Sequence, residues 1–208
     1  MTEPFLARVA EHVLKHGSGS PENLAVVLPS QRAAVYFRQH FSRIVPEIQF
    51  APQLLTLDQL VSGCTALQSA DSIELLFQLY QSYTEVWQAD AEPFDRFLKW
   101  ASLALADFSE VDAYLIDPKA FFRDLTNLKE LDAWSLNEPD LTTTQQQYAW
   151  FWKKLGELYF HFTASLKNQN LAHAGLLFRD AAENIETKGR LIDFEHVFFC
   201  GFNALSTS

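Results

Sequence analysis

Two histidines near the N-terminus have the first spacing that could support metal chemistry. His12 and His16 are four residues apart, so on a helix both imidazole rings would lie on one face, where they could bind a metal. A zinc site needs a third protein ligand, and the neighbouring sequence supplies none. We therefore predict that both histidines lie on a solvated helix face and that the chain has no metal ligands.

A second arrangement spells the signature of a metal-dependent nuclease. Pro139-Asp140 followed by Glu186-Thr187-Lys188 matches PD…(D/E)xK, a pattern that needs its carboxylates and lysine on adjacent strands around Mg²⁺. The first pair lies in a predicted loop and the second at the end of a helical pattern. We interpret the match as coincidence, because so short a pattern often arises by chance.

The stretch HGSGSPEN, residues 16–23, looks like a phosphate-binding loop. A Walker A loop follows a strand and opens a helix, so that its backbone amides and its lysine hold the phosphates. This stretch follows a predicted helix instead, lacks the lysine and contains Pro21. It therefore predicts a helix C-terminus and a connector.

Two further clusters have structural explanations. Helix N-caps and first-turn carboxylates explain the acidic residues without a metal; these are Asp107, Glu110, Asp112 and Asp117. The aromatic and basic segment 148–162 could stack nucleobases. Its helical spacing favours a core stripe with a solvated lysine flank; the stripe is Phe151, Leu155, Leu158 and Phe162, and the flank is Lys153 and Lys154. No serine, cysteine and histidine constellation indicates a catalytic site.

Composition predicts a helix-dominated protein. The 208 residues are 48% hydrophobic with only seven glycines, which favours helices around a sizeable core. The formal net charge of −10 argues against nucleic acid wrapped over the whole surface, because phosphate binding needs clustered lysine and arginine. Cys64 and Cys200 fit free thiols of a reducing compartment. Because we find neither a signal peptide nor a membrane span, we expect a cytoplasmic protein that does not contact a membrane.

Apolar runs bounded by turn residues predict short strands at 24–28, 48–50 and 196–200. Periodicity and capping residues predict helices at 4–16, 31–43, 56–67, 71–87, 93–108, 109–116, 117–131, 142–168 and 174–185. We therefore expect a predominantly helical α/β fold with a parallel sheet of few strands.

The same pattern predicts the organisation of the chain. The strand-bearing segments 1–55 and 171–208 would form one domain, and 56–170 a large helical insertion. Because the last residues come just after a strand with no helix to follow it, we expect this chain to be part of a longer protein.

The predicted strand, turn and helix VVLPSQRAAVYFRQHF, residues 26–41, resembles a segment of superfamily 1 helicases whose turn contacts single-stranded DNA. HVFFCGFNALSTS, residues 196–208, resembles the place where those enzymes carry their Walker B acid, and AddB-type subunits share the apolar strand followed by Gly-Phe. Other stretches resemble one AddB-type group, the inactivated superfamily 1 helicases with a PD-(D/E)XK nuclease: PFLARVAEH, APQLLTLDQL, IELLFQLYQSY, FDRFLKWASLALADFSEVDAYLIDPKAFFRDL and FWKKLGELYFHF.

This resemblance implies a partial helicase 1A domain, similar to a P-loop NTPase, with a 1B-like helical insertion. The parent would be a DNA-repair exonuclease whose nuclease centre and, in many members, iron–sulfur cluster lie far beyond this region. Cys200 would occupy the position of the Walker B aspartate that coordinates Mg²⁺, and no Walker A loop precedes Leu24. We therefore expect neither ATP hydrolysis nor a cofactor in this chain.

The resemblance places Ser30, Gln31 and Arg32 in the DNA-contacting turn, and Asn203 in the turn after the last strand is a weaker candidate. Arg32 could equally be an ordinary surface residue. The expected role is to guide single-stranded DNA and to scaffold an AddA-like motor subunit. The alternative is an acidic helical module that docks a partner without touching DNA. A basic strip beside Ser30–Arg32 would favour the first of these roles.

Overall fold

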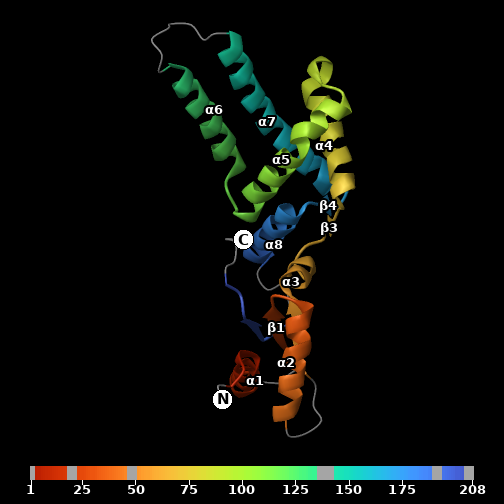
Figure 1. Ribbon diagram of the computed structural model, residues 1–208, viewed down its shortest axis with the longest axis vertical. Coiled ribbons are helices and arrows are strands. Elements are labelled where there is room, and N and C mark those ends of the chain that lie inside the picture. The colour runs from red at the N-terminus through yellow and green to blue at the C-terminus, as the bar shows by residue number, and fades with distance from the viewer. Residues whose placement is uncertain (1–2, 18–22, 46–50, 135–142, 189–193, 204–208) are drawn as a thin grey trace. The chain divides into compact units, whose positions relative to one another are not determined.

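The computed structural model describes residues 3–17, 23–45, 51–134, 143–188 and 194–203, with side chains outside 127–134 and 143–149. The chain forms two compact units, which are described separately (Figure 1). Unit 1 comprises Met1–Thr65 and Ala181–Leu205, and unit 2 is essentially Ala66–Asp180. The division thus falls after residues 65 and 180, where the sequence predicted boundaries after 55 and 170.

Unit 1 contains a three-stranded parallel sheet in the order β2-β1-β5. The central strand β1 (Leu24–Leu28) is buried along its whole length, as its continuous apolar run predicts. It pairs with β2 (Gln53–Thr56) on one side and β5 (His196–Phe199) on the other. The strands predicted at 24–28 and 196–200 are confirmed. The strand predicted at 48–50 lies outside the described residues, and the strand that follows it in the structure is β2.

Helices α1 (Phe5–His16) and α2 (Gln31–Ile44) pack against each other and against one face of β1. Their buried side chains meet those of Leu24, Val26 and Leu28 in one apolar cluster. Both helices were predicted within one residue of their observed ends. Their amphipathic patterns are strong because only one stripe of each faces the sheet.

The short helix α3 (Leu57–Gly63) begins at the capping box that the sequence predicts. The Gln59 backbone N–H donates to Thr56 Oγ1 over 3.4 Å, and the Thr56 N–H donates to Gln59 Oε1 over 3.0 Å. The helix ends at Gly63 instead of near residue 67, because the next residues turn into β3 (Gln68–Ser69).

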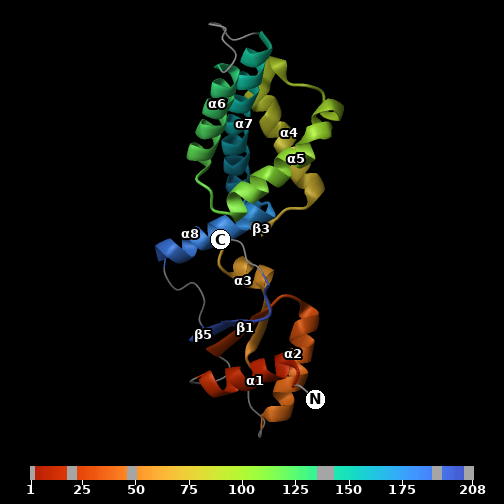
Figure 2. The ribbon, with the colours of Figure 1, turned by 60° about the vertical axis from the view of Figure 1, so that its left-hand side comes forward.

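Unit 2 is built from long helices, seen together in Figure 2. They are α4 (Ser72–Trp87), α5 (Phe94–Ala113), α6 (Pro118–Trp134) and α7 (Thr143–Asn168), with the short 3-10 helix η2 (Gln88–Asp90) after α4. Helix α4 packs against α5 and α7, and α7 packs against α6. The strand β3 pairs in parallel with β4 (Leu171–Ala172), and α8 (Ala174–Lys188) starts in unit 2 and ends in unit 1.

The predominantly helical α/β class is therefore correct, but the break predicted between the helices at 93–108 and 109–116 is wrong. The sequence predicts a separate helix at 109–116, whereas α5 runs without interruption to Ala113. Ser109 does not start a helix. Its hydroxyl accepts a hydrogen bond from the Gly175 N–H of α8 over 3.0 Å. Among the described residues, no helix is both long and apolar enough to span a lipid bilayer.

Candidate nucleic-acid interface

The candidate DNA-contacting residues follow the carboxyl ends of the strands of unit 1. The strands run parallel, with Leu28 opposite Thr56 and Val27 opposite Phe199, so their carboxyl ends lie side by side. The turns that follow all three strands therefore leave the sheet at the same edge. In open parallel sheets this edge is the usual place for a ligand.

Ser30 and Gln31 have structural roles in the turn after β1. Ser30 is the N-cap of α2, and its hydroxyl accepts a hydrogen bond from the Ala33 N–H over 3.2 Å. The Gln31 side-chain amide donates to Gln59 Oε1 over 3.1 Å, which ties the start of α2 to the capping box of α3. Arg32, next in sequence, is exposed. Of the three residues predicted for this turn, Arg32 is the charged one, and its exposure leaves it accessible to a phosphate.

The turn after β5 lies beside the turn after β1. Gly201 has φ +82°, a left-handed conformation that glycine adopts without strain. A β-carbon on Gly201 would lie 3.6 Å from the ring of Pro29, so the two turns are in contact. Asn203 is exposed in this turn. The structure thus brings the two predicted segments together, although it records no bond between Asn203 and Ser30–Arg32.

Cys200 extends the pairing of β5, because its N–H donates to the Val27 carbonyl over 3.0 Å. Its side chain packs against the apolar cluster beneath α1 and lines a cavity of about 250 Å³ with His12, Val13 and Phe198. Burial raises the pKa of the Cys200 thiol. A protonated thiol in apolar surroundings is a poor ligand for Mg²⁺, which prefers carboxylate and water oxygens.

A basic stripe on α2, which the sequence analysis missed, starts at the same turn. It consists of Arg32, Tyr36, Gln39 and Arg43, which recur every three or four residues and are all exposed. The opposite face of the helix, with Ala34, Phe37 and Phe41, is buried. Helix α2 contains three arginines and no acidic residue. Eleven residues of helix place Arg32 and Arg43 about 16 Å apart along the axis.

The two units differ in charge. Unit 1 has seven lysine and arginine residues against nine aspartate and glutamate residues, whereas unit 2 has nine against seventeen. Unit 2 therefore carries −8 of the net charge of −10, and unit 1 carries −2. The acidic composition of the whole chain does not describe the surface beside Ser30–Arg32. Among the described residues, the α2 stripe places two exposed arginines on a helix that has no acidic residue, which is the charge that attracts phosphate.

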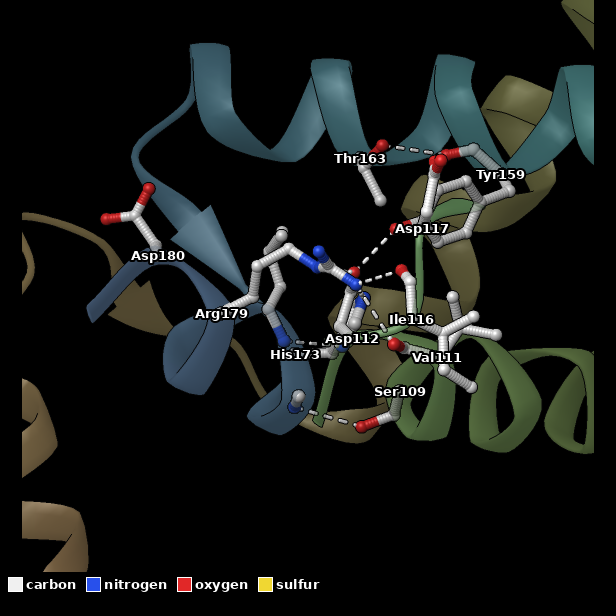
Figure 3. Close-up of polar contacts among 12 residues, drawn as sticks. Ser109, Val111, Asp112, Ile116, Asp117, Tyr159, Thr163, His173, Arg179 and Asp180 are labelled. Atoms are coloured by element: carbon white, nitrogen blue, oxygen red, sulfur yellow. Dashed lines mark hydrogen bonds and ion pairs between the residues drawn. The ribbon is translucent and has the colours of Figure 1, made fainter. Parts of the chain in front are cut away.

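Unit 2 holds a buried polar cluster around Asp112, shown in Figure 3. Asp112 Oδ1 accepts hydrogen bonds from the Tyr159 hydroxyl over 2.5 Å and from Arg179 Nε over 2.6 Å. Arg179 Nη2 also donates to the backbone carbonyls of Val111 and Ile116. The sequence interpretation placed Asp107, Glu110 and Asp112 at helix starts and was wrong for all three, because they lie in the second half of α5. Asp112 lies fully buried in the last turn of that helix.

His173 completes this cluster from the start of α8. Its Nδ1 accepts a hydrogen bond from the Leu176 N–H over 3.2 Å, so Nε2 carries the proton of the neutral ring. Nε2 lies 3.3 Å from Asp112 Oδ2, but outside the geometry of a hydrogen bond. Burial lowers the pKa of His173 to about 4, against the opposing effect of the Asp112 charge. The hydrogen bonds of Asp112 connect α5 to α7 and α8. Asp112 and His173 are 0% and 2% exposed, so a substrate could not reach them.

The structure also describes residues of the other motifs singled out in the sequence. His12 and His16 are exposed as predicted, and their rings stack on each other with centroids 4.1 Å apart. Of the core stripe predicted on α7, Leu158 and Phe162 are fully buried, whereas Phe151 and Leu155 are only partly buried. Pro139 and Asp140 lie outside the described residues. Within the described part of the chain, no group of three or more acidic, histidine or cysteine side chains could hold a metal.

Comparison with known proteins leaves the family open. No protein-family model matches the sequence, and a search of curated proteins finds no similar sequence.

Proposed function

We propose that this chain is a non-catalytic, helicase-like region of a DNA-repair helicase–nuclease of the AddB type. Its role is to guide single-stranded DNA along unit 1. In this proposal the sheet of unit 1 corresponds to part of a helicase 1A domain, and the helices of unit 2 correspond to a 1B-like insertion. The chain is cytoplasmic, and an AddA-like motor subunit supplies the ATP hydrolysis that this chain does not perform.

The basic stripe on α2 carries the proposal. Arg32 and Arg43 can neutralise phosphates, and Tyr36 between them, 52% exposed, offers a ring on which a base can stack. Ser30 and Gln31 hold the turn from which the stripe starts, and Asn203 lies in the adjoining turn. These groups contact backbone and base faces, so the proposed grip does not depend on sequence.

The surroundings of Cys200 support the absence of ATP hydrolysis. Phosphoryl transfer needs Mg²⁺ held by a carboxylate and phosphates held by a loop lysine. The position that the resemblance assigns to the carboxylate holds a partly buried thiol with a raised pKa. The helix that follows β1 is capped by the Ser30 hydroxyl and begins with Gln31 and Arg32.

Binding of a fluorescein-labelled 20-nucleotide oligothymidine, followed by fluorescence anisotropy, tests the proposal. Removing one phosphate contact weakens binding to a single strand by about fivefold at 0.1 M salt. We expect that loss for Arg32→Ala. The matched control is Arg96→Ala, an exposed arginine of α5 in unit 2, which should bind like the wild type. Equal binding by Arg32→Ala and the wild type would remove Arg32 from the interface.

The acidic charge of unit 2 favours the second candidate function, a module that docks a protein partner without touching DNA. Under that alternative, the wild-type chain shows no anisotropy change with oligothymidine at 50 mM salt. That result would contradict the whole DNA-guiding proposal, whereas equal binding by Arg32→Ala and the wild type would contradict only the assignment of Arg32.

A further inference from the structure

Unit 2 contains an apolar groove of about 430 Å³ between α5 and α6, with α7 as its floor. From α5 it is lined by Leu103 and Phe108, from α6 by Phe121 and Phe122, and from α7 by Leu155. Leu103 is 66% exposed and Phe121 37%, so large apolar side chains on both walls face water. Contiguous exposed apolar side chains of this kind mark interaction sites in proteins.

The arrangement of the helices gives the groove the shape of a helix-binding site. Helices α5, α4, α7 and α6 pack in that order, each against the next, and the groove lies between the first and the last. Along α5 and its C-cap Tyr114, the lining residues recur every three or four positions, as on one helix face; they include Trp100, Leu103, Asp107, Glu110 and Tyr114. That stripe is about 21 Å long. An elongated occupant, such as a helix of about 14 residues, matches this length.

The charge at the rim defines the chemistry of the occupant. Asp107 and Glu110 are the charged residues that line the groove. Neither forms an ion pair with another described residue. Burial and the neighbouring Glu110 charge raise the pKa of Asp107, which means that its carboxylate lacks a compensating cation. A lysine or arginine beside these two carboxylates would lower the free energy of both.

We propose that this groove binds an amphipathic helix of a partner protein, with the apolar stripe of that helix in the groove and its lysine or arginine residues beside Asp107 and Glu110. Leucine and phenylalanine side chains of the partner helix would contact Leu103, Phe108 and Phe121. The proposal concerns unit 2 alone and holds whether or not α2 of unit 1 binds DNA.

A designed peptide tests the groove directly. The probe is a fluorescein-labelled 16-residue peptide with leucines along one helical stripe and lysines on its flanks. Two control peptides are a scrambled sequence without the stripe and a version with glutamate in place of lysine. Anisotropy should show that the wild-type chain binds the probe at least about tenfold more tightly than either control. Equal binding of the probe and the scrambled peptide would overturn the proposal.

Two exposed residues provide a matched pair of protein variants. Leu103 lies in the groove and Ile73 lies on α4 outside it, and both are 66% exposed, so a charge at either position should leave the fold intact. We expect Leu103→Glu to weaken probe binding by about tenfold or more and Ile73→Glu to change it less than about twofold. Asp107→Asn with Glu110→Gln should reduce the preference for the lysine peptide over the glutamate peptide. Unchanged binding by Leu103→Glu would exclude the groove as the site.

Sedimentation of the chain alone distinguishes a partner helix from a second copy of this chain. The proposal predicts a monomer across about 1–100 μM, because the acidic rims of two grooves would repel each other if two copies met groove to groove. A dimer that Leu103→Glu dissociates and Ile73→Glu does not would overturn it in favour of self-association.

Discussion

Arg179 of α8 and Asp112 of α5 form a buried ion pair, with Arg179 Nε 2.6 Å from Asp112 Oδ1. The pair joins positions 67 residues apart in the chain. Arg179 also satisfies two carbonyl oxygens near the end of α5, and Tyr159 donates to the same carboxylate oxygen. The end of α5, the middle of α7 and the start of α8 are thus held by one carboxylate.

Arg179→Met should destabilise unit 2 by about 3–5 kcal/mol, because it leaves the Asp112 charge buried without a cation. The double variant with Asp112→Asn should recover part of that loss. Urea unfolding followed by tryptophan fluorescence measures it, since all five tryptophans lie in unit 2. The control is Arg123→Met, because Arg123 pairs with Asp124 on the surface and its loss should cost less than about 1 kcal/mol. Similar losses for Arg179→Met and Arg123→Met would contradict the role of the cluster.

Gly175→Ala should also destabilise unit 2, by about 2 kcal/mol or more. A β-carbon at Gly175 would overlap the Ser109 backbone carbonyl, which cannot move without shifting α5. Gly156→Ala is the comparison, because its β-carbon would meet the Phe122 side chain at 3.1 Å and alanine favours the helix. We expect Gly156→Ala to stay within about 1 kcal/mol of the wild type in the same urea experiment. If the two variants were equally stable, α8 would not approach α5 as closely as described.

The buried His173 predicts a pH dependence of stability. Its pKa is about 4 in the folded chain and near 6.5 in the unfolded chain, so the unfolded state binds the proton first. The stability that the neutral ring contributes is complete above pH 6.5 and is lost as the pH falls towards 4, by about 3 kcal/mol. His173→Asn keeps an N-cap acceptor for the Leu176 N–H but cannot titrate. Urea midpoints between pH 7 and 4 should fall more steeply for the wild type than for this variant; parallel curves would exclude His173 as the cause.

The α2 stripe predicts a salt dependence of DNA binding. For a single strand, each phosphate contact contributes about 0.7 to the slope of log affinity against log salt concentration. Arg43→Ala should lower that slope by about this amount, and Arg32→Ala with Arg43→Ala by about twice as much. Titrations of oligothymidine between 50 and 200 mM salt measure the slope. A slope that is the same in the wild type and the double variant would mean that α2 does not contact phosphates.

Local signals in the sequence predicted the helix starts well. Thr56, Asp71 and Asp117 all accept hydrogen bonds from backbone N–H groups at the starts of α3, α4 and α6. Such a cap involves a side chain and an N–H two or three residues later, so residue type and spacing suffice to predict it. The same reasoning failed for Asp112, because its partners Tyr159 and Arg179 are brought to it by tertiary structure alone.

The candidate interface could likewise be predicted only in part, because some of its contacts are local in sequence and others depend on tertiary structure. A polar turn after an apolar strand indicated Ser30–Arg32, but the contact of Gly201 with Pro29 depends on the pairing of β1 with β5. The basic stripe could have been found from sequence, because Arg32, Tyr36, Gln39 and Arg43 have helical spacing.

The pairing of β1 with β5 has a consequence for biosynthesis. Leu24 lies opposite His196, so the ribosome must make all of unit 2 before the central strand of unit 1 meets its second neighbour. At typical rates of translation this interval lasts roughly 10–35 seconds. During it, β1 exposes an unsatisfied edge, while the helices of unit 2 are already complete in sequence and can fold. Until β5 is made, this edge of β1 can pair with other extended segments, and a chaperone that binds the nascent chain there would prevent such contacts.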